Sequence, residues 1–236
     1  MSDLETIIFK SRAELVANAA QMIYEKVSNP PSLNDAFHLA ITGGTVGTLV
    51  LRALGKITKN AHIANVHVWW VDERFVTRDS PDRNELQARA AWLAESEIPE
   101  RNIHPFPASD GVSIEEAALS FANEIEKIQP KFDLALLGMG EDGHVASLFP
   151  GSTPRLIGDW VAIETNSPKP PTQRLSLSFA ALNGSKEVLF LVSGVEKSQA
   201  VSDVTNGKDL PAGNVTGVNK TMWLLDEDAA SRITSS

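Results

Sequence analysis

The segment from Gly138 to Gly151 carries the residues whose types and spacing best suit catalysis. It follows an apolar run at 132–137 that predicts a buried strand. Three glycines within six residues allow the backbone to turn sharply and to approach a ligand. Beside them lie a carboxylate and an imidazole two residues apart, Asp142 and His144. An imidazole can accept a proton from water near neutral pH, and a carboxylate can orient it or hold its charge.

A second charged group, Asp72-Glu73-Arg74, directly follows an apolar and aromatic run at 66–71 that predicts another strand. Open α/β sheets place their ligands at the carboxyl ends of strands, so these side chains are well placed to line a crevice. The guanidinium of Arg74 stays charged and could bind an oxyanion through two N–H groups. The sequence leaves open whether Asp72 or Asp142 orients His144.

Thr42-Gly43-Gly44-Thr45 stands between a predicted strand and a predicted helix. Its backbone amides and the helix N-terminus could bind an anion, although a tight turn would look the same. It matches neither the P-loop nor the Gly-x-Gly-x-x-Gly spacing. Arg174 and Lys197 each stand at a strand end or a helix start and are candidate phosphate ligands, or ordinary surface cations.

Other kinds of catalytic centre find little support. The chain has no cysteine, which excludes disulfides, thiolate catalysis and Cys-ligated zinc. One histidine with carboxylates is a poor zinc set, so we expect neither a metal nor another cofactor. Ser147 lies near His144, but no Gly-x-Ser-x-Gly nucleophile elbow is present. We expect the other four histidines to be structural: His38, His62, His67 and His104.

The elements that must position these residues alternate between helix and strand. Helices are predicted at 11–27, after Thr42-Gly43-Gly44 and through Leu54, near 82–95, from a Ser113/Glu116 capping box to 128, and from about 196. Strands are predicted at 37–41, 66–71, 132–137, 160–164, 174–178, 187–193 and 221–225. This alternation predicts an α/β fold, a Rossmann-like open, mainly parallel sheet with helices on both faces. The proline-rich segment 166–173 is interpreted as a surface loop, so 1–236 forms a single domain.

Composition narrows the class further. Of 236 residues, 42% are hydrophobic, which is enough for a real core. The net charge of −9 argues against nucleic acid or an anionic membrane as the main partner. No signal peptide and no apolar run of membrane-spanning length is visible. We therefore expect a cytoplasmic protein that is a monomer or a weak homo-oligomer and binds a small molecule.

Taken together, these segments resemble the 6-phosphogluconolactonases, within the glucosamine-6-phosphate isomerase/6-phosphogluconolactonase family, over nearly the whole chain. The resemblance rests on Thr42-Gly43-Gly44, 70–74, Asn84, 137–151, Arg174-Leu175-Ser176, 194–197 and Leu210-Pro211-Ala212. Two positions depart from the family pattern. The glycine loop continues Thr45-Val46-Gly47 where the family often has Ser/Thr-Thr-Pro, and Arg83-Asn84 replaces the usual Ser-Asn.

The resemblance implies hydrolysis of 6-phospho-D-glucono-1,5-lactone to 6-phosphogluconate in the pentose phosphate pathway, without a cofactor. In this reading His144 activates water, with Asp142 or Asp72 beside it, and Arg74 stabilises the oxyanion. The phosphate ligands would be Gly43, Gly44, Thr45, Arg174 and Lys197.

Two alternatives remain. The glucosamine-6-phosphate deaminases resemble this family in fold, but typically have Asp-Glu-Tyr at 72–74 and Phe-Asn-Glu-Pro-Gly at 147–151, where this chain reads Ser-Leu-Phe-Pro-Gly. The second alternative is a non-catalytic sugar-phosphate sensor. Such a protein would be expected to carry a DNA-binding helix-turn-helix, whereas this chain starts directly with the α/β pattern and keeps Asp72, Arg74 and His144.

Overall fold

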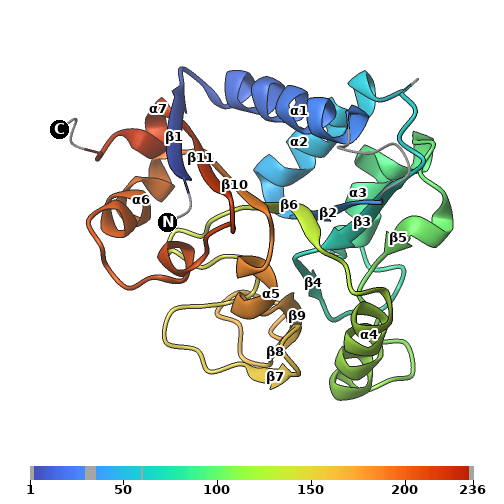
Figure 1. The fold of residues 1–236 in the computed structure, drawn as a ribbon. Coiled ribbons are helices and arrows are strands. Elements are labelled where there is room, and N and C mark those ends of the chain that lie inside the picture. The colour runs from blue at the N-terminus through green and yellow to red at the C-terminus, as the bar shows by residue number, and fades with distance from the viewer. Residues whose placement is uncertain (1–2, 30–35, 60, 234–236) are drawn as a thin grey trace.

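A computed structural model describes residues 3–29, 36–59 and 61–233. The centre of the described structure is a seven-stranded sheet whose neighbouring strands all pair in parallel (Figure 1). The strands stand in the order β1 (Asp3–Phe9), β11 (Lys220–Asp226), β10 (Glu187–Val192), β6 (Phe132–Leu137), β2 (Phe37–Ile41), β3 (Val66–Trp70) and β5 (Ile103–His104). The predicted open parallel sheet is confirmed.

The strand order changes direction between β2 and β6. From β2 the chain moves outward through β3 to β5, whereas from β6 it moves the other way through β10 to β11. In open parallel sheets a crevice forms at such a point, outside the carboxyl ends of the strands. The segments that follow β2, β6 and β10 therefore meet there, and they include the Gly43-Gly44 turn, the Asp142/His144 loop and Lys197.

Helices cover both faces of the sheet, as expected. In Figure 1, α1 and α2 lie above the sheet, while α4 and α5 lie below it. The helices are α1 (Arg12–Ser28), α2 (Gly44–Ile57), α3 (Asn84–Ala91), α4 (Ile114–Ile128), α5 (Phe179–Asn183), α6 (Ser198–Thr205) and α7 (Glu227–Ala230). Short 3-10 helices span Leu93–Glu95, Glu100–Asn102, Val195–Lys197 and Pro211–Asn214. The predicted capping box of Ser113 and Glu116 starts α4.

A second, four-stranded antiparallel sheet was not predicted. Its order is β4 (Asp72–Arg74), β9 (Arg174–Leu177), β8 (Val161–Glu164) and β7 (Arg155–Ile157). The strands expected near 160–164 and 174–178 thus exist, but they belong to this sheet rather than to the parallel one. Asp72–Arg74 is itself a strand, and it pairs Arg74 with Arg174. This pairing brings two of the predicted site cations to one place.

Several elements and element boundaries differ from the sequence prediction. Strand β1 was missed, because its alternation of charged and apolar residues was not interpreted as a strand. The helix expected at 82–95 ends as an α-helix at Ala91, and a 3-10 turn follows. The helix expected from about Glu196 begins as a 3-10 turn and continues as α6 from Ser198.

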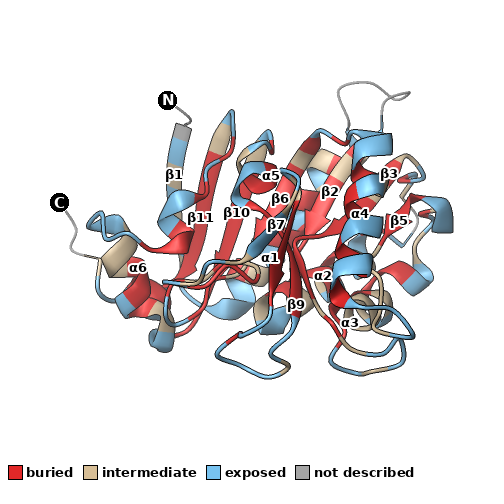
Figure 2. Ribbon diagram, turned by 90° about the horizontal axis from the view of Figure 1, so that it is seen from below, coloured by how far each residue is buried: buried red, intermediate tan, exposed pale blue. Residues whose placement is uncertain are grey.

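The core lies between the parallel sheet and its helices. Figure 2 shows the central strands almost wholly buried, while the helices present a buried and an exposed side. Trp69, Trp70, Phe121, Phe132 and Phe190 are among the largest side chains that are fully buried. Burial of such side chains stabilises the sheet that positions the site.

Three of the four remaining histidines form an aromatic cluster below the sheet. His67 Nδ1 lies 3.0 Å from His104 Nε2, and His104 Nδ1 lies 2.6 Å from a carboxylate oxygen of Glu124 on α4. Trp69 donates its indole N–H to His38 Nδ1 at 3.1 Å and stacks on His104. The cluster therefore joins β2, β3 and β5 to α4, which agrees with a structural role for these three histidines.

The fourth, His62, has a different environment. Its side chain is 99% exposed, and its Nδ1 lies 3.7 Å from a carboxylate oxygen of Glu97. At such exposure an ion pair contributes little to stability, so the expected structural role does not apply to His62.

We predict that the histidine cluster makes the free energy of unfolding depend on pH. Burial, and then the neighbouring His67, lowers the pKa of His38 to about 4. An unfolded chain binds a proton at His38 near pH 6.5, whereas the folded protein does so only near pH 4. The free energy of unfolding should therefore fall as the pH decreases from about 6.5 towards 4. In His38→Gln, whose amide oxygen still accepts from Trp69, the urea midpoint should change less between pH 7.5 and 5. An equal change in both proteins would contradict this.

Candidate active site

The turn after β2 exposes backbone amides to an anion. Gly43 is the N-cap of α2 and provides no side-chain cap, and Gly44 has φ = 76°, a conformation that favours glycine. The first N–H groups of a helix have no partner within the helix, and the helix dipole adds positive charge there. A Cβ on Gly43 would lie 2.0 Å from the side-chain oxygen of Asn84, so only glycine fits at this contact.

The loop after β6 pairs His144 with Asp142. His144 Nδ1 lies 2.6 Å from Asp142 Oδ1, which also accepts from the backbone N–H of His144 at 3.2 Å. Burial raises the pKa of Asp142, but the imidazole beside it outweighs that effect and holds the pKa below its usual value. With the Nδ1 proton held by a carboxylate, Nε2 is left with the lone pair that a general base needs. The imidazole ring packs on Phe149, with ring centroids 4.5 Å apart.

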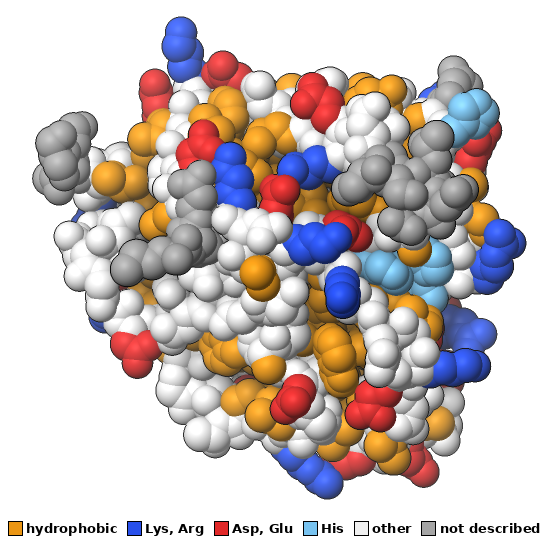
Figure 3. Space-filling model, in the orientation of Figure 1, with side chains coloured by type: hydrophobic (Ala, Val, Ile, Leu, Met, Phe, Trp, Pro, Cys, Tyr) orange, Lys and Arg blue, Asp and Glu red, His pale blue; other side chains and the backbone are white. Residues whose placement is uncertain are grey.

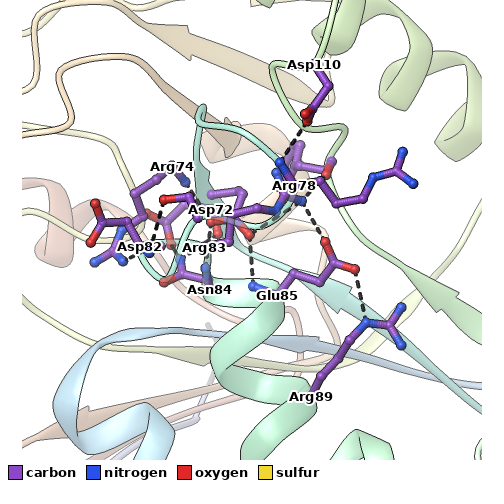
Figure 4. A network of polar contacts seen from close by, with 12 residues as sticks. Asp72, Arg74, Arg78, Asp82, Arg83, Asn84, Glu85, Arg89 and Asp110 are labelled. Carbon is purple, nitrogen blue, oxygen red and sulfur yellow. Dashed lines mark hydrogen bonds and ion pairs between the residues drawn. The ribbon is translucent and has the colours of Figure 1, made fainter.

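Asp72 belongs to a different network. Its Oδ2 accepts from the Ser147 hydroxyl at 2.7 Å, and its Oδ1 lies 3.4 Å from the side-chain amide of Asn84. The same amide donates to the backbone carbonyl of Asp72 at 2.9 Å. Figure 4 shows Asp72, Arg74 and Asn84 together beside the N-terminus of α3. The carboxylate in contact with His144 is therefore Asp142, and Asp72 is oriented from Ser147 and Asn84.

Buried Glu73 fixes the position of this network. Its carboxylate accepts from the backbone N–H groups of Arg74, Asn84 and Glu85 at 2.7, 2.7 and 2.9 Å. Burial raises its pKa to about 7, although Arg83 and these three N–H groups favour the ionised form. Arg83 is 1% exposed and donates to Glu85 and to the carbonyl of Phe106. Glu73 thus ties β4 to the first turn of α3.

The site cations differ in how strongly they are already engaged. Arg74 donates to the backbone carbonyl of Asp82 at 2.6 Å, and Arg174 donates to carbonyls of the loop that precedes it. Burial lowers the pKa of Arg174, but a guanidinium remains charged under ordinary conditions. Lys197 is half-buried, and its ammonium group makes no hydrogen bond or ion pair within the part of the chain that the structure describes.

One pocket at the switch point brings most of these groups together. It is lined by Thr42, Gly43, Gly44, Asp72, Arg74, Asn84, Gly138, Met139, Gly140, His144, Ala146, Phe149, Lys169, Arg174 and Lys197. Seven of the nine predicted site residues line it. Asp142 is not in its lining and acts on the pocket through His144, while Thr45 lines a neighbouring hollow beside Arg12 and Ser193.

Sequence reasoning did not assign several lining residues to the site. Asn84 was only part of the family resemblance, and Lys169 lay in a segment interpreted as a surface loop. Phe149 belongs to the Phe-Pro-Gly that closes the central motif, but its contact with the imidazole depends on the folded loop. A signal for Asn84 was its place shortly after the Asp-Glu-Arg strand; Lys169 had no such signal.

Three further properties concern the surface charges, the helices and the possible metal ligands of the protein. In Figure 3, acidic and basic side chains are interspersed over the visible face. Within residues 3–29, 36–59 and 61–233, no helix is long and apolar enough to cross a membrane. In the same ranges, no group of three or more histidine, aspartate or glutamate side chains is arranged to hold a metal ion.

A crevice at the switch point of a parallel α/β sheet, lined by a glycine turn, cations and a histidine that a carboxylate holds, is typical of an α/β protein that binds a small anionic ligand. The protein-family model described as "Glucosamine-6-phosphate isomerases/6-phosphogluconolactonase" matches residues 10–223, so the chain belongs to that family.

The family description covers two activities, and the relatives with the higher sequence identity are lactonases. The 6-phosphogluconolactonase of Mycobacterium leprae is 36% identical over 239 residues, which cover 96% of this chain and 97% of the relative. The crystal structure of the Thermotoga maritima 6-phosphogluconolactonase has a TM-score of 0.80 and 29% identity, covering 96% of this chain and all of that one. A monomeric glucosamine-6-phosphate deaminase shares the fold, with a TM-score of 0.82 at 21% identity, covering 96% and 99% of the two chains.

Proposed function

We propose that this protein hydrolyses 6-phospho-D-glucono-1,5-lactone to 6-phosphogluconate, the lactone-opening step of the oxidative pentose phosphate pathway. The observation that carries the proposal is the His144–Asp142 pair, whose imidazole lines the same pocket as the predicted cations Arg74, Arg174 and Lys197. The similarity to relatives named 6-phosphogluconolactonase over nearly their whole length supports the same activity.

In the proposed mechanism His144 is the general base. Its Nε2 takes a proton from water as the water oxygen attacks C1 of the lactone. Arg74 stabilises the oxyanion that forms on the carbonyl oxygen. When the bond from C1 to the ring oxygen breaks, the imidazolium returns the proton to that oxygen, which becomes the 5-hydroxyl. The new carboxyl group then releases its own proton to solvent.

The remaining residues bind and orient. The amides at Gly43 and Gly44 and the ammonium group of Lys197 hold the 6-phosphate, Arg174 supports them from the start of β9, and Asp142 keeps the Nδ1 proton of His144 in place. Asp72 lies in the pocket, held by Ser147 and Asn84, where it can accept a hydrogen bond from a sugar hydroxyl. No step in this mechanism requires a metal or an organic cofactor. We also propose a single-domain, cytoplasmic enzyme that is monomeric or self-associates weakly.

A glucosamine-6-phosphate deaminase must move a proton between carbons and therefore needs further acid–base groups. At the position where deaminases have the glutamate of Phe-Asn-Glu, this chain has Phe149, an apolar ring that packs against the imidazole of His144 at a tilt of 45°. Arg74 stands where they have tyrosine. Both differences favour the lactonase.

The function is tested by supplying the two substrates side by side. With fresh 6-phosphogluconolactone we expect product to form far faster than in the spontaneous reaction. With glucosamine 6-phosphate we expect no release of ammonia. Sustained ammonia release at a rate comparable to lactone opening would contradict the proposal, as would a lactone reaction no faster than its spontaneous background.

A further inference from the structure

The loop between β8 and β9 places a further cation, Lys169, in the pocket. Lys169 stands at neither a strand end nor a helix start, so the sequence pattern gave no reason to select it. The loop is the proline-rich segment 166–173, which the sequence analysis interpreted as a surface loop. Lys169, in its middle, lines the same pocket as His144 and Lys197. Its ammonium group makes no hydrogen bond or ion pair with any residue in the described ranges. Because the exposed ammonium group of Lys169 has no partner among these residues, it is available to bind a ligand.

Arg174 holds this loop in place. Its Nε donates to the carbonyl of Pro171 at 2.7 Å, and its Nη2 donates to the carbonyls of Lys169 at 3.1 Å and Pro170 at 3.4 Å. Arg174 is only 7% exposed, at the start of β9. Two of its three nitrogens are therefore committed to three consecutive carbonyls. At most Nη1 is left for a ligand, which makes Arg174 chiefly a positioning residue for the loop.

Lys169 and Lys197 approach one another from different elements. Lys197 ends the 3-10 turn Val195–Lys197 after β10, whereas Lys169 comes from the β8–β9 loop. Burial lowers the pKa of Lys197, and the charge of Lys169 lowers it further, although Glu141 acts in the opposite direction. Two like charges facing one pocket repel each other, and a dianion bound between them removes that cost.

We propose that Lys169 is a specificity-determining residue that binds the 6-phosphate together with Lys197, and that Arg174 acts on the phosphate mainly through the position of the Lys169 loop. This inference rests on the proposed function for the identity of the substrate. It assigns the selectivity for a phosphorylated over a plain lactone to a pair of lysines, rather than to an arginine and a lysine.

The test compares two lactones that differ only in the phosphate. In Lys169→Ala we expect kcat/KM for 6-phosphogluconolactone to fall about tenfold or more, mainly through KM, because a charge-assisted hydrogen bond is lost. For plain glucono-1,5-lactone it should stay within about twofold. Lys169→Arg should recover part of the loss. Lys127→Ala removes an exposed lysine at the end of α4 and should change neither substrate.

A double-mutant cycle separates positioning from direct contact. If Arg174 acts through the loop, Arg174→Gln should raise KM for the phosphorylated lactone strongly in the wild type and only weakly in Lys169→Ala. Fully additive effects would overturn the positioning role of Arg174. Equal effects of Lys169→Ala on both lactones, or none on either, would overturn the assignment of Lys169, and this exposed position can be substituted without disturbing the core.

Calorimetric binding of 6-phosphogluconate distinguishes a failure of this inference from a failure of the function. Binding needs no turnover, so a weaker Kd in Lys169→Ala supports the lysine pair even if the wild type does not open the lactone. An active wild type whose Kd for 6-phosphogluconate is unchanged by Lys169→Ala would leave the function standing and overturn the inference.

Discussion

Replacing His144 with asparagine is expected to lower kcat about 10²- to 10⁴-fold, the usual contribution of a positioned general base. Asparagine cannot accept a proton from water, but it is similar in size and can still bond with Asp142. KM and the thermal midpoint should therefore change little, because the imidazole lies in the pocket lining rather than in the core.

The matched control for this variant is His62→Asn. His62 is almost fully exposed and outside the pocket, so its replacement removes an imidazole without touching the site. Turnover should be measured with fresh lactone and corrected for the spontaneous reaction. A folded His144→Asn protein with nearly full activity would remove His144 from the mechanism.

Gly140→Ala is expected to reduce kcat about 100-fold, although it changes neither His144 nor Asp142. A Cβ at Gly140 would lie 2.0 Å from His144 Nδ1 and 2.5 Å from Asp142 Oδ1. Such contacts are impossible, so the imidazole and the carboxylate must move apart or away from the loop. A shift of about 1 Å in a catalytic group is enough to cost about 10²-fold in rate.

The backbone of Gly140 does not require glycine, because its φ is not positive, so the effect isolates the contact with the pair. Gly213→Ala is a suitable control. Its φ is also not positive, and its Cβ would meet Val204 Cγ1 at an ordinary 3.5 Å. If Gly140→Ala had the turnover of Gly213→Ala, the close contact of the pair with the loop would not matter for catalysis.

The parallel sheet could be predicted because its central strands are mostly apolar runs, each interrupted by at most one polar residue, between glycines, prolines and amphipathic helices. The 132–137 run is the clearest case, and it is strand β6. The antiparallel sheet could not be predicted, because β4 is only three residues long and directly follows Val71. Its charged residues, Asp72 to Arg74, look like the end of a strand, and their pairing with β9 depends on a segment one hundred residues away.

The site residues could be predicted where side chains suited to catalysis stand close together in the sequence. Asp142 and His144 stand two residues apart, so a contact between them follows from a tight turn. Whether Asp72 also reaches the imidazole depends on Ser147 and Asn84, which hold it elsewhere. Lys169 could not be assigned, because it reaches the pocket through a proline-rich loop held by Arg174, and such tertiary contacts leave no periodic signal.

The outermost strand of the parallel sheet has a consequence for the order in which the chain is assembled. Among the described strands, β1 pairs with β11 alone, from Asp3 opposite Lys220 to Phe9 opposite Asp226. During synthesis β1 is made more than two hundred residues before its partner strand. Closing a loop of that length carries an entropic cost on the order of 5 kcal/mol, so local pairings form earlier. Until β11 has been made, the nascent chain therefore carries Ile7 and Phe9, which pack against the core in the folded protein, on an unpaired strand that is a natural target for chaperones.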